Sequence, residues 1–221
     1  MVGKLLKDKF LKKCGFFNCM KILAAGDMHG DKGLAEKLAK RAIDENIDLV
    51  ILCGDLTYFE KDTSGIIGPF VAADKKVLMV PGNHEDVSTV DFLAKYYNVR
   101  NLHGYSVCYG DVGIFGAGGA TEVGPRSKIT QENMLELLGQ GHGYIEYMGK
   151  KIMITHEHPT ESAIESFTKF FKGSSAIRKA VDDFQPDFLL CSHVHEAEGI
   201  EELMGKTKVV NVGKNGKIIE I

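Results

Sequence analysis

The chain has 221 residues, of which 44% are hydrophobic and 26% are charged. That length is enough for one well-buried core, and these fractions exclude collagen-like, low-complexity and disordered proteins. The 27 Lys and Arg residues nearly balance the 30 Asp and Glu residues, and the net charge of −3 excludes a global basic field for extended nucleic-acid binding. No apolar run approaches the roughly 18 residues that a transmembrane segment needs.

The cysteines indicate a reducing compartment. There are five of them and no C-x-x-C pair, which argues against a disulfide framework and against a structural zinc site. Cys53 and Cys191 end apolar runs typical of strands, so we interpret them as small buried hydrophobic residues. We therefore expect a cytoplasmic protein.

Residues 1–19 form a basic amphipathic N-terminal extension, and the rest, 20–221, is predicted to be one domain. Val2, Leu5 and Phe10 share one stripe of a helix, while most lysines fall elsewhere. Lysines interrupt the apolar stretch throughout, which argues against a signal peptide. The extension fits a docking helix or a start placed ahead of Met20, and a membrane-surface helix is the alternative.

From Lys21 the chain alternates strand, loop and helix. The apolar patterns predict strands at Lys21 to Ala25, Ile47 to Cys53 and Lys76 to Val80, with helices at Lys32 to Asn46 and Val87 to Tyr97 and a weaker one within Thr63 to Asp74. Beyond Val99 short strands dominate, at Tyr105 to Tyr109, Val112 to Phe115, Tyr144 to Tyr147, Lys151 to Thr155 and Asp187 to Cys191.

Helices are predicted to return at Gln131 to Leu138, Thr160 to Phe171 and Ser174 to Phe184. The dipeptide Asn215-Gly216 predicts a final hairpin, because such a pair suits a two-residue turn. These elements indicate one α/β domain with a mixed sheet or with two stacked sheets.

Polar residues follow each of the first three predicted strands. Asp27 and His29 follow the first, Asp55 follows the second, and Asn83, His84 and Glu85 follow the third. Loops at the carboxyl ends of strands converge on one crevice in α/β folds, so these side chains should meet.

Two histidine clusters follow strands of the second half, His156 with His158 and His193 with His195. The candidate ligands Asp27, His29, Asp55, Asn83, His156, His193 and His195 are seven nitrogen or oxygen donors without a thiolate. Seven are too many for one tetrahedral ion, and they suit two ions that share a carboxylate. We expect two divalent transition-metal ions, Mn²⁺ first, with Fe, Zn²⁺, Ni²⁺ and Co²⁺ as alternatives.

This series of motifs resembles the calcineurin-like metallophosphoesterase superfamily, whose pattern is D-x-H, G-D, G-N-H-D/E, a lone H and G-H-x-H. Here it runs from Asp27 to His195, with Ser192 in place of a Gly. The resemblance implies a four-layer sandwich of two stacked mixed β-sheets flanked by helices. It also implies that Asp27, His29 and His195 hold one metal, that Asn83, His156 and His193 hold the other, and that Asp55 bridges. Because His158 lies two residues after His156, either imidazole could be the ligand. The order of the motif, with the ligand directly after the strand, favours His156.

The same resemblance implies a binuclear-metal-dependent phosphoesterase. Two ions would lower the pKa of a bridging water and supply hydroxide. His84 is the residue to which the family gives the role of acid, with Glu85 either orienting it or lying on the surface. His103 and His142 are interpreted as surface residues.

The substrate is predicted to be a small phosphorylated molecule, and a phosphodiester before a monoester. The phosphate-gripping arginines of the protein phosphatase branch are absent, since Leu56 to Glu60 and Pro81 occupy their places. Gly118, Gly119 and Arg126 could bind phosphate through backbone N–H groups and one guanidinium, although a plain loop explains them equally well. A non-catalytic scaffold is the alternative function, and a homo-oligomer stays open.

Overall fold

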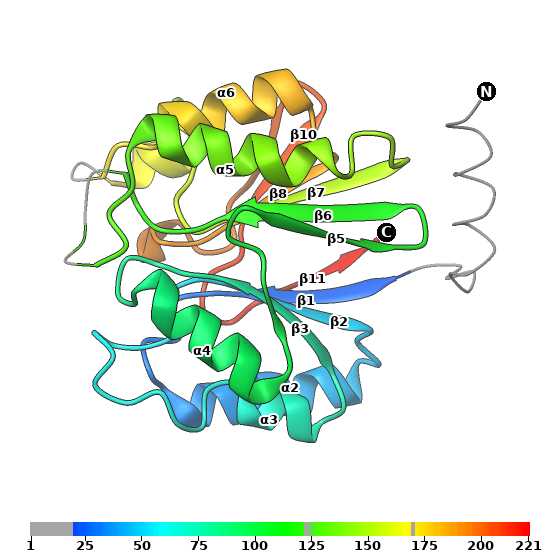
Figure 1. Ribbon diagram of the computed structural model, residues 1–221, viewed down its shortest axis with the longest axis vertical. Helices are drawn as coiled ribbons and strands as arrows, with labels where there is room; N and C mark the ends of the chain where they lie inside the picture. Colours follow the sequence, from blue (N-terminus) through cyan, green and yellow to red (C-terminus); the bar gives the residue numbers. More distant parts are fainter. Residues whose placement is uncertain (1–19, 122–123, 125, 169–170) are drawn as a thin grey trace.

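Two mixed sheets stack face to face, and helices cover both outer faces (Figure 1). The computed structural model describes residues 20–221 apart from 122–123, 125 and 169–170, so the predicted extension 1–19 lies outside the described residues. The arrangement confirms the predicted four-layer α/β sandwich and decides for two stacked sheets over a single mixed one.

The five-stranded sheet contains β11 (Lys217–Glu220), β1 (Lys21–Ala25), β2 (Leu49–Cys53), β3 (Lys76–Val80) and β4 (Arg100–Asn101), in this order. The six-stranded sheet contains β5 (Tyr105–Tyr109), β6 (Val112–Ala117), β7 (Lys150–Thr155), β8 (Phe188–Cys191), β10 (Thr207–Asn211) and β9 (Glu201–Met204). The strands β1 to β4 are parallel to one another, as are β6, β7, β8 and β10. Loops after these strands therefore leave each sheet at one edge.

The helices divide between the two outer faces (Figure 1). The first sheet is covered by α2 (Lys32–Asp44), α3 (Gly68–Ala72) and α4 (Val87–Tyr97), and the second by α5 (Gln131–Gly143) and α6 (Ser175–Phe184). Two short 3₁₀ helices, η1 (Ile164–Phe167) and η2 (His195–Ala197), lie in loops. Each of α2, α5 and α6 begins after a residue whose side chain accepts a backbone N–H, respectively Asp31, Thr130 and Ser174.

Three apolar layers hold the sandwich together. In β2, Val50 and Leu52 pack toward the helices while Leu49 and Ile51 pack against the other sheet, as the two-residue period of a strand requires. Because both faces of this strand are buried, its sequence is a continuous apolar run rather than an alternating one. The layer between the sheets is completed by residues such as Ile152 of β7.

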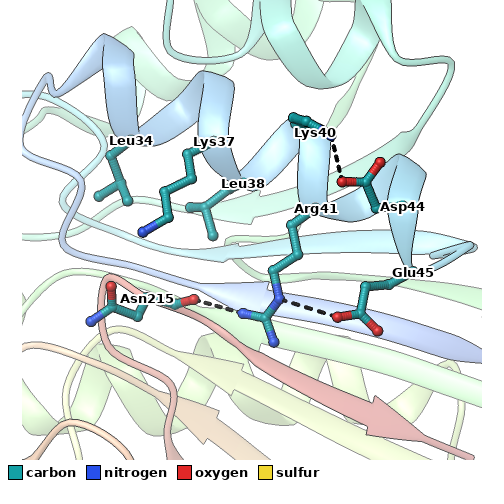
Figure 2. Close-up of a pocket in the computed structure, with 8 residues that line it drawn as sticks. All are labelled: Leu34, Lys37, Leu38, Lys40, Arg41, Asp44, Glu45 and Asn215. Carbon is teal, nitrogen blue, oxygen red and sulfur yellow. Dashed lines mark hydrogen bonds and ion pairs between the residues drawn. The ribbon is translucent and has the colours of Figure 1, made fainter.

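The predicted hairpin at Asn215-Gly216 is wrong. The strand before this turn, β10, pairs with β8 and β9 in one sheet, whereas β11 after it pairs with β1 in the other. The turn therefore carries the chain between sheets. Figure 2 shows how α2 fixes it: the Arg41 guanidinium lies 2.9 Å from the Asn215 carbonyl oxygen.

Two further elements differ from the prediction. The segment Tyr144 to Tyr147 forms turns after α5 instead of a strand, with the buried Ile145 donating its N–H to the His142 carbonyl. The predicted helix from Thr160 to Phe171 is reduced in the described residues to η1, because Glu161 adopts a left-handed backbone with φ 58°. Glu165 instead accepts backbone N–H groups of this loop.

Candidate active site

Loops from both sheets bring the seven predicted ligands to one place. Three groups of possible metal-binding side chains form there, and within each group the ligand atoms lie within 4.8 Å of one another: Asp27, His29 and His195; His29, Asp55 and His84; and Asp55, His156 and His193. The groups overlap through Asp55 and His29. They therefore form one continuous cluster that includes His84.

The side of the cluster around His156 is tightly packed. Its Nε2 atom lies 2.9 Å from Asn83 Oδ1, 3.1 Å from His193 Nδ1 and 3.5 Å from Asp55 Oδ2. Four side chains from loops after four different strands thus point their donor atoms at one small volume. That is how side chains are arranged around a common cation.

The other side contains His29, His195 and Asp27. The Nε2 atoms of His29 and His195 lie 3.2 Å apart, and His195 Nε2 lies 3.8 Å from Asp27 Oδ1. The Oδ2 atom of Asp55 lies 3.7 Å from His29 Nε2 and so faces this side as well as the His156 side. Asp55 occupies the position between the two ligand groups.

Hydrogen bonds to backbone groups orient the ligand side chains. His156 Nδ1 lies 2.8 Å from the Cys53 carbonyl oxygen, which accepts the Nδ1 proton and directs Nε2 into the cluster. The Asp27 carboxylate accepts the N–H of His193, and the Asp55 carboxylate accepts the N–H of His84 at 3.0 Å. Each ligand loop is thereby tied to another one.

The electrostatics separate the imidazoles into two kinds. Burial lowers the pKa of His29 to about 4 and that of His193 to about 3, so both are neutral near pH 7 and have free lone pairs. Burial also lowers the pKa of His156, but the carboxylates of Asp55 and Asp27 outweigh it and raise that pKa to about 10. Without a cation, His156 therefore carries the positive charge that offsets the buried acids.

The two buried carboxylates also differ from each other. Burial raises the pKa of Asp27 to about 6. Burial likewise raises the pKa of Asp55, but the surrounding histidines, His156 foremost, hold it below its usual range. Asp55 is therefore the permanent anion of the cluster.

Four predicted ligands have strained backbones: φ is 52° at Asp27, 46° at His29, 49° at Asp55 and 73° at His193. A left-handed conformation costs energy for residues with a Cβ and is concentrated at functional sites. The loops also approach one another closely, since a Cβ on Gly82 would collide with Asp55. The glycine beside Asn83 thus permits the approach that brings two ligand loops together.

The cluster forms the floor of a cleft of about 700 Å³. Its described lining consists of His29, Asp55, Tyr58, Phe59, Asn83, His84, Gly124, Phe171, His193, His195 and Glu196. Aromatic rings dominate the wall, and no Lys or Arg belongs to this described lining.

His84 lies against the aromatic wall. Its ring stacks on Phe59 with centroids 4.1 Å apart, and its Nε2 atom lies 3.8 Å from Asp55 Oδ2. Burial lowers the pKa of His84, while the charge of Asp55 raises it. The imidazole thus stands beside the metal-ligating cluster, at the rim predicted from its place after Asn83.

Gly118, Gly119 and Arg126 are not brought into the described lining of the cleft. The Gly118 N–H is donated to His103 Nδ1 and the Gly119 N–H to the Pro81 carbonyl, so neither is free for phosphate. Arg126 binds Glu60 at 2.7 Å and Asp86 at 2.8 Å. In the described structure these three residues therefore contact other parts of the loops.

Sequence reasoning missed what Glu85 does. The carboxylate is fully buried and accepts the N–H groups of Gly82 at 2.9 Å and Leu56 at 3.1 Å. It neither lies on the surface nor faces His84, but ties together the loops that carry Asp55 and Asn83. Its place directly after the Asn-His pair was visible in the sequence, but its burial was not.

The structure also defines the surroundings of Asn211, His103 and His156. Asn211 is fully buried and donates to the carbonyl of Val194, which holds the loop of His193 and His195. His103 is half-buried rather than a surface residue, because it accepts the Gly118 N–H. His156 belongs to a possible metal-binding group whereas His158 belongs to none of those found among the described residues, in agreement with the order of the motif.

Comparison with known proteins identifies the family. The family model described as calcineurin-like phosphoesterase matches residues 20–197. An uncharacterised protein of Methanocaldococcus jannaschii is 29% identical in an alignment of 202 residues, and the match covers 87% of this chain and 87% of its own. A Thermus thermophilus protein of known structure has a TM-score of 0.71 at 20% identity and covers 90% of this chain and 91% of its own.

A dimetal phosphatase of Danio rerio shares the fold with a TM-score of 0.62 at 10% identity, over 88% of this chain and 87% of its own. An archaeal phosphodiesterase has a TM-score of 0.52 at 18% identity, over 91% of this chain and 99% of its own. Within the described part of the chain, no helix combines the length and the apolar character needed to span a membrane. The chain belongs to the calcineurin-like phosphoesterase family and is a metal-dependent phosphoester hydrolase.

Proposed function

We propose that the protein hydrolyses a small phosphodiester at a centre of two divalent transition-metal ions. Asp27, His29 and His195 would hold one ion, and Asn83, His156 and His193 would hold the other. Asp55 would be shared between the two ligand groups. The observation that carries this proposal is the position of Asp55 Oδ2, 3.7 Å from His29 Nε2 and 3.5 Å from His156 Nε2.

The donor set fits such ions. It combines imidazole nitrogens with carboxylate and amide oxygens and has no thiolate, which suits Mn²⁺, Fe, Zn²⁺, Ni²⁺ and Co²⁺. Mn²⁺ is our first choice because oxygen ligands make up almost half of the set. When bound, the ions supply Lewis acidity and lower the pKa of water, so that hydroxide is available near neutral pH.

His84 protonates the leaving oxygen. The ring stands at the rim of the cluster, and its Nε2 atom faces the same cleft as the ligands. A positioned imidazole gains roughly 10²- to 10⁴-fold in rate when it delivers a proton to a leaving group. Burial lowers the pKa of His84, and Asp55, which keeps its negative charge, opposes that lowering.

The lining of the cleft supports a diester rather than a monoester. A diester carries one negative charge at neutral pH and a monoester carries up to two, and gripping the second charge is typically the work of Arg or Lys side chains. The described lining offers histidines and the rings of Tyr58 and Phe171 instead. Aromatic walls contribute apolar contact to the organic groups on either side of the phosphate.

We also place the protein in the cytoplasm. Cys53 and Cys191 are free thiols in the described part of the chain, and free thiols persist in reducing compartments. Cys53 and Cys191 are fully buried within the sheets, where they pack as small apolar side chains.

The test compares two substrates on one metal-stripped preparation. Hydrolysis of bis-p-nitrophenyl phosphate and of p-nitrophenyl phosphate is followed after Mn²⁺, Ni²⁺, Zn²⁺ or Mg²⁺ is added back separately. The proposal predicts release from the diester that requires a transition metal and exceeds release from the monoester. Monoester-only release would contradict the diester preference, and metal-independent release would contradict the two-ion centre.

A further inference from the structure

His84 is oriented by ring contacts rather than by a hydrogen bond to its side chain. Its Nδ1 atom is buried and has no hydrogen-bond partner within the described part of the chain, and its Nε2 atom lies 3.8 Å from the nearest carboxylate oxygen, that of Asp55. Imidazoles that transfer protons are commonly held by a hydrogen bond to the second ring nitrogen. The planar contact with Phe59, at 4.1 Å and 25°, takes the place of that bond.

Phe59 is itself held in an unfavourable conformation. Its φ is 52° and that of Glu60 is 57°, and two consecutive residues with side chains are rarely left-handed without surrounding contacts that enforce it. Tyr58 contacts Phe59 edge-on, with centroids 4.5 Å apart. The strained backbone turns the Phe59 ring toward His84 instead of toward solvent.

Three charged side chains enforce that conformation. Glu60 accepts the backbone N–H of Asp86 at 2.8 Å and binds Arg126 at 2.7 Å, and Arg126 also binds Asp86 at 2.8 Å. We call Glu60, Asp86 and Arg126 the loop brace. It joins the loop after β2, which carries Phe59, to the loop after β3, which carries His84. The distance between the Phe59 and His84 rings is thereby fixed.

We propose that Phe59, held by the loop brace, is a positioning residue that aligns His84 for proton transfer to the leaving oxygen. The inference rests on the proposed role of His84. In that step an oxygen from water bonds to phosphorus, the bond between phosphorus and the leaving oxygen breaks, and the proton on His84 Nε2 goes to that leaving oxygen. A His84 ring that is free to tilt would transfer its proton less efficiently. The resulting loss in rate would be larger for a more basic leaving group.

The experiment measures dependence on the leaving group. Methyl p-nitrophenyl phosphate and methyl phenyl phosphate differ only in their leaving groups, p-nitrophenol and phenol. Phenol has a pKa of about 10 and is much the poorer leaving group. The ratio measured is kcat for methyl p-nitrophenyl phosphate divided by kcat for methyl phenyl phosphate. It is determined for wild type, Phe59→Leu, Phe59→Tyr and His84→Ala, all loaded with the same metal. Phe59→Leu keeps apolar volume and removes the flat ring, and Phe92→Ala, at an exposed stack with Tyr96 outside the site, is the matched control.

The proposal predicts that Phe59→Leu raises the ratio roughly tenfold, which is a part of the 10²- to 10⁴-fold range for a general acid. KM and the bound metal should stay unchanged, Phe59→Tyr should restore the wild-type ratio, and Phe92→Ala should have no effect. Arg126→Gln, which loosens the loop brace, should change the ratio in the same direction by a smaller factor.

Two results would overturn this inference while leaving the proposed function intact. One is an unchanged ratio in Phe59→Leu although His84→Ala raises it. The other is a raised KM with an unchanged ratio, because Phe59 would then contact substrate instead of His84. If His84→Ala itself leaves the ratio unchanged, His84 is not the acid, and the proposed function fails at that point.

Discussion

Two clefts of this protein differ in how their charged groups are paired. The cleft beside α2, about 440 Å³ in volume, contains side chains that satisfy one another: Lys40 binds Asp44 at 2.6 Å, and Arg41 binds the Asn215 carbonyl (Figure 2). In the cleft above Asp55, imidazole nitrogens face each other at 3.2 Å, and buried atoms such as His193 Nε2 have no partner within the described residues. The cleft above Asp55 is the candidate active site because its described residues leave polar atoms without partners, and not because of its size.

The largest difference in phosphodiester turnover is expected between a substitution of Asp55 in one cleft and a substitution of Asp44 in the other. Asp55→Ala should lower phosphodiester turnover at least about 100-fold, since it removes the permanent anion that faces both ligand groups. Asp44→Ala removes an exposed partner of Lys40 and should leave turnover unchanged. Steady-state assays at saturating metal measure both, and an Asp55→Ala variant with more than a tenth of wild-type activity would contradict the assignment.

Glu85 should dominate the stability of the active-site loops. Glu85→Ala leaves buried N–H groups of Leu56 and Gly82 without an acceptor, and we expect a loss of about 1–3 kcal/mol in the free energy of unfolding. Glu85→Gln keeps one acceptor oxygen and should lose less. Urea denaturation of the metal-free variants compares them, and equal stabilities for wild type and Glu85→Ala would show that the contacts contribute little.

The same residue predicts a pH dependence. Burial raises the pKa of Glu85 from 4.5 to about 7 in the folded protein, so the fold favours its neutral form. Its contribution to stability is fully present below pH 4.5 and is lost as the pH rises through about 7. Relative to Glu85→Gln, metal-free wild type should therefore lose unfolding free energy between these pH values. A constant difference across that range would contradict the raised pKa.

Metal binding should release a proton from one identified imidazole. Near pH 8 the His156 pKa of about 10 keeps this ring protonated, whereas His29 and His193 are already neutral. A metal ligand must be neutral, so about one proton per chain should leave on binding. Calorimetry in two buffers of different ionisation enthalpy counts these protons. Equal binding heats in both buffers would mean that His156 is neutral beforehand.

The smallest effect is expected in the cleft beside α2. Arg41→Ala removes an exposed side chain that contacts Asn215 and Glu45, and exposed pairs of this kind contribute about 0–1 kcal/mol. Thermal unfolding should shift by a few degrees at most, with turnover unchanged. A large loss of turnover in this variant would show that the two clefts are coupled.

The ligand cluster was predictable from sequence because each ligand follows a strand. Buried strands such as β2 are recognisable as apolar runs, and parallel strands send their loops to one edge, so Asp27, Asp55 and His156 had to lie near one another. The hairpin at Asn215-Gly216 was mispredicted, because a local turn signal does not specify which sheet its flanking strands join.

The roles of Glu85, Phe59 and Arg126 needed three-dimensional contacts. Glu85 accepts an N–H from Leu56, 29 residues away, and Arg126 binds Asp86, 40 residues away. Nothing in the local pattern around these residues predicts a partner at such a separation. The positive φ of Phe59 was equally hidden, since Phe, unlike Gly, Asn or Asp, gives no sequence signal for it.

We propose that Asp55 is shared by two ions, one held by the His29 side and one by the His156 side. The most direct test is the number of transition-metal ions per chain, measured by elemental analysis after loading and desalting. We expect two ions in wild type and one in each of His29→Ala and His193→Ala. A single ion in wild type, or two ions retained in both variants, would contradict it.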